Sequence, residues 1–330
     1  MTDADLAIPA HRLNLLKGFS AAAVVVMIWS GFNIVSRLGG RSPLTPYDMV
    51  AIRFVVSGMA FLPFMLTRWN RLKWPRLAVL AAIGGTGYTL FIYSGFALAP
   101  AAHAGILVNG GIPFASALIA WLILGHRPGI RTEFALLVAG LGIVLIGFHS
   151  LGQLSGAPAH QWVGDMFFLL AAISFASFVL LLKHWHVPPI EATIGVSVIS
   201  MVFYTPVYLL FLPKAITTVS LSFILLQGVY QGILAASIAG LLFTYAIHNI
   251  GPQKATLMLA MVPGISAVAA VPLLKESLDA VTISGVVLVT IGAVLGATHR
   301  LAIWHAQGPD HCGPAGQLPQ LVRAQRIPSG

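Results

Sequence analysis

The chain has 330 residues, of which 58% are hydrophobic and only 8% are charged, and its formal net charge is +9. Soluble domains carry about 25% charged residues, so this composition excludes an ordinary water-soluble fold. The apolar residues come in separate runs of roughly twenty, the length that spans the hydrocarbon core of a bilayer. The sequence therefore predicts an integral membrane protein.

The apolar runs predict ten transmembrane helices, because each run ends at a charge, a proline or a Gly/Ser cluster. In chain order they are 18–37, 47–67, 75–97, 102–124, 132–149, 162–182, 191–212, 222–248, 252–274 and 279–299. Solid apolar runs argue against a membrane β-barrel, whose strands read as alternating segments of about ten residues. The first run is too long for a typical signal peptide and lacks a good cleavage site, so we expect a retained helix.

The lysines and arginines between the helices indicate the orientation. If the N-terminus is cytoplasmic, the outer segments hold only Arg37, Arg41, Lys214 and Lys275, and the inner segments hold most of the others. We therefore expect both termini to be cytoplasmic, with 1–17 as an inner N-terminal segment. The positive charge is then mainly a topology signal, and no basic run is interleaved with aromatics as in a nucleic-acid surface.

The stretch 301–330 is rich in Gly, Pro and Gln and predicts a flexible cytoplasmic tail. It holds the only cysteine, Cys312, together with His305 and His311. One cysteine excludes an internal disulfide framework, and a chance grouping explains these three residues better than a metal site does. We expect neither a metal nor a cofactor.

The chain contains an internal repeat, because a shift of 150 residues aligns its two halves. Pro113 then meets Pro263, Ser116 meets Ser266, and Gly142 meets Gly292. The repeats are predicted to cover 18–150 and 151–300, with five helices each. Since five is odd, the two copies must cross the membrane in opposite directions. Inverted repeats are typical of secondary transporters, whose substrate site lies near the midplane between the halves.

The segment "VNGGIP" at 108–113 places helix-disrupting residues in the middle of a predicted helix. A proline in a helix interior removes one amide donor and frees the carbonyl four residues earlier. Such breaks are tolerated in a membrane only where they face protein or a wet cavity. The matched positions predict two interrupted helices that serve as gating points at Gly110, Gly111, Pro113, Pro263 and Gly264. The alternative is a pair of purely structural kinks.

Polar and aromatic residues at helical spacing predict a central substrate cavity. Each residue taken singly is more often packing between helices than a ligand contact, since Ser and Thr commonly join membrane helices. As a set they indicate a neutral cavity lined by aromatic rings and thioethers. The predicted lining residues are Trp29, Asn33, Tyr88, Tyr93, His103, Asn109, Ser174, Ser177, Tyr230, Ser237, Tyr245, Met258 and Met261.

Arg53 is a charge inside the second helix, where a charged residue costs about 2.5–3.5 kcal/mol. It is interpreted either as a gate or anion contact, or as a side chain that snorkels to the interface or pairs with Asp48. The acidic residues all lie near helix ends, so a proton relay built on a central carboxylate is not indicated. His103 and His248 are candidates to titrate, although a satisfied interfacial histidine is the simpler interpretation.

Four stretches carry a family resemblance. They are "WSGFNIVSR" at 29–37, "MVAIRF" at 49–54, and the helix ends "ILGHRPGIRTEF" and "LLKESLDAVTISGVVLVTIG". Together they resemble the EamA-type family of the drug/metabolite transporter superfamily. The resemblance implies the all-α fold with ten helices in two inverted repeats, and export by alternating access, with bacterial amino-acid exporters as the nearest match. In that family the fourth and ninth helices usually end in a Gly-Glu-like motif. Glu276 matches it, but His126 replaces the first glutamate.

The predicted function is a secondary transporter in the bacterial inner membrane that exports aromatic or other hydrophobic amino acids. A zwitterionic or neutral solute is favoured because no central pair of cations is present for a phosphate. A multidrug or other metabolite exporter is the alternative, while an intramembrane enzyme or a channel is disfavoured. The expected partners are the solute and the lipid bilayer. Gly292 with Gly296, or Gly228 with Gly232, would suit either a homodimer or packing within one chain.

Overall fold

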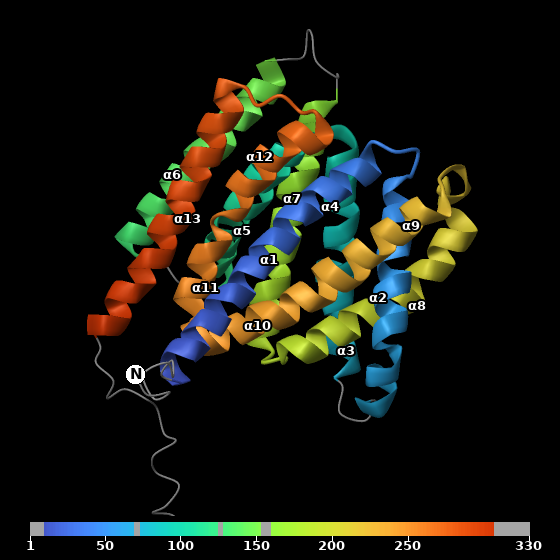
Figure 1. Cartoon of the computed structure of the whole chain (residues 1–330), viewed down its shortest axis with the longest axis horizontal. Coiled ribbons are helices and arrows are strands. Elements are labelled where there is room, and N and C mark those ends of the chain that lie inside the picture. Colours follow the sequence, from blue (N-terminus) through green and yellow to red (C-terminus); the bar gives the residue numbers. More distant parts are fainter. Residues whose placement is uncertain (1–9, 69–72, 125–127, 153–159, 307–330) are drawn as a thin grey trace, which may run out of the picture.

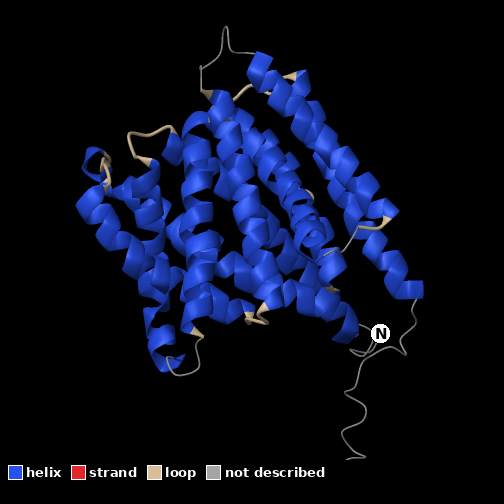
Figure 2. Ribbon diagram, turned by 180° about the vertical axis from the view of Figure 1, so that it is seen from behind, coloured by secondary structure: helices blue, strands red, loops and turns tan. Residues whose placement is uncertain are grey.

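The computed structural model describes residues 10–68, 73–124, 128–152 and 160–306. Its regular structure in these ranges is helical throughout, as Figure 2 shows. The single-helix spans are α1 (Ala10–Gly40), α2 (Pro46–Arg68), α5 (Ala101–Leu124), α6 (Ile130–Gly152), α7 (Gln161–His184), α8 (Pro189–Phe211) and α13 (Ala280–Ala306). The composite spans join α3 (Trp74–Leu80), η3 (Ala81–Gly87) and α4 (Tyr88–Leu98); α9 (Leu221–Gln227), η6 (Gly228–Ile238) and α10 (Ala239–Ile250); and α11 (Pro252–Leu259) and α12 (Val262–Leu274). A short turn, η5 (Ile216–Thr218), precedes α9.

Within the described ranges, nine spans are long and apolar enough to cross a membrane, and Ala280–Gly296 forms a shorter tenth. The predicted ten-helix, all-α membrane fold is therefore confirmed. The largest differences from the predicted ends are that α1 begins at Ala10 and that α13 continues to Ala306. Residues 307–330, which hold Cys312 and most of the predicted tail, lie outside the described residues, as do 1–9.

The two halves of the chain pack against each other through corresponding helices. In Figure 1, α6 (green) and α13 (red) lie side by side along one edge, and α2 packs along α8. Small residues allow the first contact, since a Cβ on Gly292 would meet the Ala135 carbonyl oxygen at 2.8 Å and one on Gly142 would meet that of Gly285 at 2.9 Å. In this arrangement Gly292 is used within one chain.

The third span of each half contains a π-helical segment, η3 in one and η6 in the other. Both segments are rich in glycine and approach a helix of the opposite half. A Cβ on Gly85 would lie 2.6 Å from the Ser200 hydroxyl of α8, and one on Gly232 would lie 3.0 Å from the Arg53 carbonyl oxygen of α2. π-Segments are rare and often mark functional sites.

The two prolines of the repeat differ in their structural effect. α5 runs continuously through Pro113, whose side chain is exposed, so the predicted interruption at 110–113 is wrong. The ninth span does break, at Ala260 and Met261, where backbone N–H groups bond three residues back. Pro263 then lies in the first turn of α12, a position that requires no amide donor from the residue.

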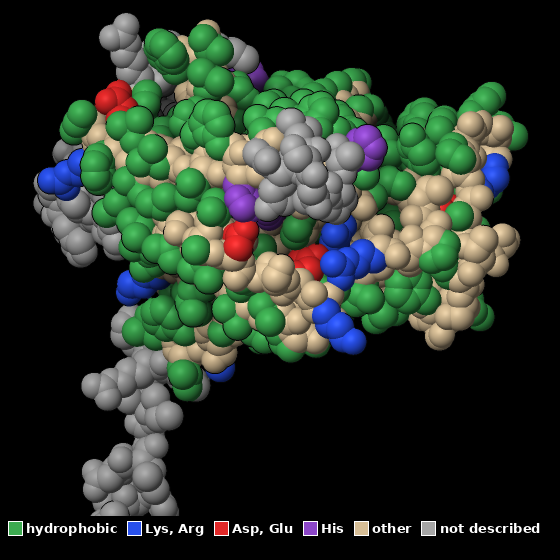
Figure 3. Space-filling model, turned by 90° about the horizontal axis from the view of Figure 1, so that it is seen from above, with side chains coloured by type: hydrophobic (Ala, Val, Ile, Leu, Met, Phe, Trp, Pro, Cys, Tyr) green, Lys and Arg blue, Asp and Glu red, His purple; other side chains and the backbone are tan. Residues whose placement is uncertain are grey.

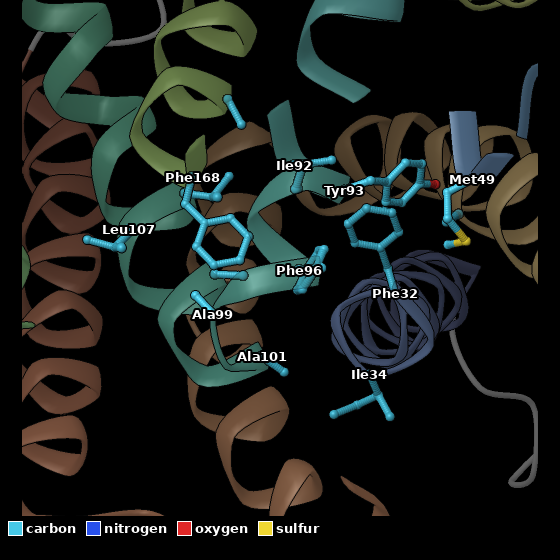
Figure 4. Packing of buried hydrophobic residues seen from close by; sticks show 14 of the residues in the cluster. Phe32, Ile34, Met49, Ile92, Tyr93, Phe96, Ala99, Ala101, Leu107 and Phe168 are labelled. Atoms are coloured by element: carbon cyan, nitrogen blue, oxygen red, sulfur yellow. The ribbon is translucent and has the colours of Figure 1, made fainter. Parts of the chain in front are cut away.

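The largest apolar core lies where α1, α2, α4, α5 and α7 meet. Phe32, Tyr93, Phe96 and Phe168 are each at most 8% exposed. Figure 4 shows these rings in a row from α7 to α1, with Tyr93 next to Phe32 and pointing towards Met49. The Phe32 ring at the end of this row lies next to Arg53 of α2.

Candidate functional site

Arg53 lies inside the bundle at the junction of α1, α2, α4 and η6. Its guanidinium carbon is 5.7 Å from the centroid of the Phe32 ring. The hydroxyls of Tyr88 and Tyr93 on α4 lie within electrostatic reach of this charge. Asp48, the carboxylate considered as its partner, is instead bound by Thr45 and other groups at the end of α2. The arginine thus stands among aromatic rings.

This junction contains several buried polar atoms with no hydrogen-bond partner in the described part of the chain. They are Arg53 Nη1, Ser57 Oγ, Tyr93 Oη and Gln231 Oε1. Buried polar side chains normally find partners, so each such atom requires an explanation. They belong to α2, α4 and η6, and the last two elements each pack against α2.

Two glutamines of the eighth span form hydrogen bonds to α1 beside this junction. Gln231 donates through Nε2 to the Ser36 hydroxyl at 3.0 Å, and Gln227 donates to the Val35 carbonyl at 3.0 Å. Both glutamines are fully buried. The sequence prediction omitted Phe32, Ser57 and these two residues. The spacing of Gln227 and Gln231, four residues apart in an apolar helix, was the available signal.

Other predicted site residues form bonds that hold the helices together. Trp29 on α1 donates to the Ala235 carbonyl of η6 at 3.4 Å, and Ser174 on α7 donates to the Ile83 carbonyl of η3 at 2.7 Å. Each π-segment is therefore bonded to the first helix of the opposite half.

Tyr230 and Asn33 likewise attach α1 to its neighbours. The Tyr230 hydroxyl donates to the Ile28 carbonyl at 3.1 Å, and Asn33 donates to the Ser266 hydroxyl of α12 at 2.9 Å. Asn33 is 6% exposed, so its contact joins α1 to the helix that follows the break.

Ser177 and Ser237 bond within their own spans, to the carbonyls of Ile173 and Gly232. The Tyr88 ring packs against Phe175 of α7 with a centroid distance of 5.2 Å. Of the thirteen predicted lining residues, Tyr88 and Tyr93 are thus the two that interact electrostatically with the arginine.

The remaining predicted residues lie elsewhere in the bundle. Tyr245 and Met261 are exposed, and Met258 packs against the small alanine cluster between α1 and α10. Asn109 is half-buried on α5. The structure does not gather these four residues around Arg53.

The glycines of "VNGGIP" are contact points between helices. A Cβ on Gly110 would lie 3.0 Å from Val289 of α13, and one on Gly111 would lie 2.9 Å from Ala172 of α7. A Cβ on Gly264 would meet nothing within 4 Å, so close packing does not require that glycine. Close approach explains the first two glycines better than a helix break does.

Charged side chains gather at the end of the bundle that carries the α12–α13 turn, as the view onto that end in Figure 3 shows. Glu276 accepts from Arg37 Nε at 2.9 Å and lies 3.4 Å from Arg41 Nη2. Its second oxygen accepts from the backbone N–H of Ala101 at the start of α5. One buried carboxylate thus joins α1, α5 and the end of α12.

His103 and Asp165 form a second buried group at the same end. His103 Nδ1 lies 2.8 Å from Asp165 Oδ1, and Ser150 donates to Asp165 Oδ2 at 2.5 Å. The first residue is 3% exposed and the second 2%. His103 is thus a satisfied histidine that joins α5, α6 and α7, as the simpler interpretation expected.

His149 and Asp279 form a more exposed pair beside it, 2.7 Å apart. Burial raises the pKa of Asp279, but hydrogen bonds from Thr282 and the charges of His149 and His103 outweigh it, so the net pKa is lowered. Asp279 is therefore held as the carboxylate.

The sequence model of the EamA-like transporter family matches residues 16–148 and again 162–298. The inner membrane transporter YedA of Escherichia coli K12 is 26% identical over 295 residues, which span 86% of this chain and 93% of the relative. An uncharacterized transporter of Archaeoglobus fulgidus is 23% identical over 292 residues, or 83% and 94% of the two chains.

A solved crystal structure agrees with these sequence matches. It superposes with a TM-score of 0.58 and 21% identity, covering 88% of this chain and 99% of the other, which shows a shared fold. Two family matches that together cover most of the chain establish its membership. This multi-pass membrane protein belongs to the EamA-like transporter family.

Proposed function

We propose that the chain is a secondary transporter that exports aromatic or other hydrophobic amino acids, or related metabolites, by alternating access. The observation that carries this proposal is the pair of π-segments in corresponding spans of the two halves. A transporter built from inverted repeats changes access when one set of helices rocks against the other.

The π-segments give this motion two related points at which the bundle can bend. Each packs closely against the second helix of the opposite half, and each accepts a side-chain hydrogen bond from the first helix of that half. If either segment changed register by one residue, the side-chain donor from the neighbouring helix would bond the next carbonyl instead. Bending at η3 and η6 would then open opposite ends of the bundle in turn.

The substrate class is supported by the aromatic junction. Phe32, Tyr88 and Tyr93 offer ring faces and edges on which an apolar or aromatic side chain packs favourably. A hydrophobic cation, as carried by many drug exporters, is disfavoured because Arg53 already places a positive charge there.

The proposed orientation places both termini in the cytoplasm and the Glu276 end outside. The excess of Lys and Arg in the alternate segments supports this orientation. Glu276 and Arg37 join helices at the proposed outer end, which fits a state closed towards the outside. The relative YedA is an inner membrane transporter, and we propose the same membrane here.

The test is a counterflow assay with purified protein in proteoliposomes. Liposomes loaded with unlabelled L-phenylalanine should accumulate labelled L-phenylalanine, with uptake that saturates, and leucine should compete better than aspartate or lysine. A lipophilic cation such as ethidium distinguishes the multidrug alternative, and flux that never saturates would indicate a channel. The amino-acid proposal fails if no amino acid gives counterflow.

A further inference from the structure

The Arg53 guanidinium is a buried cation with an N–H group that is available to an anion. Its Nη1 is buried and has no hydrogen-bond partner in the described part of the chain. Cations inside a membrane protein are normally paired, because an unpaired charge in a low-dielectric interior is costly. Asp48 accepts bonds from Thr45, Tyr208 and the Ala215 backbone N–H, so it is engaged elsewhere.

Three more unpartnered atoms surround this junction. Ser57 lies four residues after Arg53, one turn further along the same face of α2. The close approach of Gly232 to the backbone of both residues brings η6, and with it the neighbouring Gln231, to that stretch of α2. Tyr93 enters from α4, and its hydroxyl lies close enough to the Arg53 guanidinium to interact with it, although no hydrogen bond of normal geometry joins the two.

The chemical types of these atoms match a zwitterion. A guanidinium N–H and two hydroxyls are donors suited to a carboxylate. Gln231 donates its amide nitrogen to Ser36 and Gln227, which leaves Oε1 as an acceptor. An α-ammonium group needs such an acceptor, and the aromatic rings beside it suit an apolar side chain.

We propose that Arg53 binds the carboxylate of the transported solute, with Tyr93 and Ser57 as further donors and Gln231 Oε1 as the acceptor for its ammonium group. The solute class is therefore α-amino acids with an apolar side chain. This inference rests on the proposed function and adds the residues that recognise the substrate.

The test compares competitors that differ only in the charged groups. Against labelled L-phenylalanine in counterflow, L-phenylalaninamide lacks the carboxylate and 3-phenylpropionate lacks the ammonium group. In the wild type the amide should compete about tenfold or more weakly than L-phenylalanine, since tenfold corresponds to about 1.4 kcal/mol. Arg53→Gln should abolish this discrimination, whereas the control Arg131→Gln, at an exposed arginine of α6, should keep it.

Tyr93→Phe gives a second, gentler test. Its hydroxyl is buried without a partner, so its removal should leave thermal stability unchanged or slightly raised. The same variant should raise the half-saturating concentration of L-phenylalanine several-fold while the response to the amide is unchanged. Such a split is not expected of a residue that merely supports the fold.

The outcomes separate the two proposals. Suppose that amino acids are transported. If the wild type then does not discriminate against the amide, or if Arg53→Gln discriminates against it as the wild type does, this inference is wrong and the proposed function stands. If no amino acid is transported, the proposed function fails. The inference is then decided by whether 3-phenylpropionate raises the melting temperature of the wild type but not of Arg53→Gln.

Discussion

Arg37 and Glu276 form a buried ion pair, 2.9 Å between Nε and Oε1, across 239 positions of the sequence. Their side chains are 11% and 5% exposed. Arg37 also donates to the Phe96 carbonyl at 2.6 Å, and Glu276 accepts from the N–H of Ala101. The pair therefore holds α1, the α4–α5 connection and α12 together at one end of the bundle.

Glu276→Gln should destabilise this end. Breaking a buried pair by removing one partner costs about 3–5 kcal/mol, because the other charge stays buried and unpaired. We expect a lower melting temperature in detergent and greater protease access to the α12–α13 turn. The exposed neighbour Lys275→Gln is the matched control and should change neither quantity. A melting temperature equal to that of the wild type would show that the pair does not stabilise this end of the bundle.

The His103–Asp165 contact should appear as a coupling energy. Residues in one hydrogen-bonded network couple by about 0.5–3 kcal/mol. We expect His103→Ala and Asp165→Ala each to destabilise the protein, and the double variant to lose less than the sum of the two. Chemical unfolding of the four proteins measures the cycle. Strictly additive losses would contradict a direct contact between α5 and α7.

Asp279 predicts a pH-dependent contribution to stability. Its pKa is lowered in the folded protein, so its stabilising effect is full above the ordinary carboxyl pKa of about 3.9 and is lost as the pH falls through the lowered value. Melting curves of the wild type and Asp279→Asn should therefore differ most near neutral pH and converge under strongly acidic conditions. Curves that instead diverge as the pH falls would reverse the assigned sign.

Gly111 tests the interpretation of the "VNGGIP" segment as a packing site. A leucine here would collide with Ala172 of α7, since even a Cβ would lie 2.9 Å from its methyl group. Overpacking of this kind costs about 1–3 kcal/mol. Gly147→Leu on α6 is the matched control, because a Cβ there meets nothing within 4 Å.

Pro113→Ala addresses the same segment from the other side. α5 is already continuous and the Pro113 side chain is exposed, so alanine should preserve stability or raise it slightly. Thermal unfolding compares it with Gly111→Leu. A destabilising proline replacement beside a neutral glycine replacement would favour the helix-break interpretation.

The sequence alone was sufficient for the number of spans and the family. A hydrocarbon core about 30 Å thick requires runs of about twenty apolar residues, and this requirement acts on local composition. The repeat was also recognisable in the sequence, because Pro113 and Pro263 are residues of one type at a fixed offset and no knowledge of their contacts is needed to match them. The family resemblance rested on short contiguous stretches such as "MVAIRF", which can be recognised without the tertiary structure.

Tertiary structure decided what each polar side chain does. Asn33 bonds Ser266 and His103 bonds Asp165, whereas Arg53 Nη1 has no hydrogen-bond partner in the described part of the chain. Periodicity places all three on helix faces but does not say which face meets which helix. The π-segments, and the continuity of α5 through Pro113, depend likewise on the packing of neighbouring helices, because glycines in a membrane helix permit a bend, a bulge or close contact equally well.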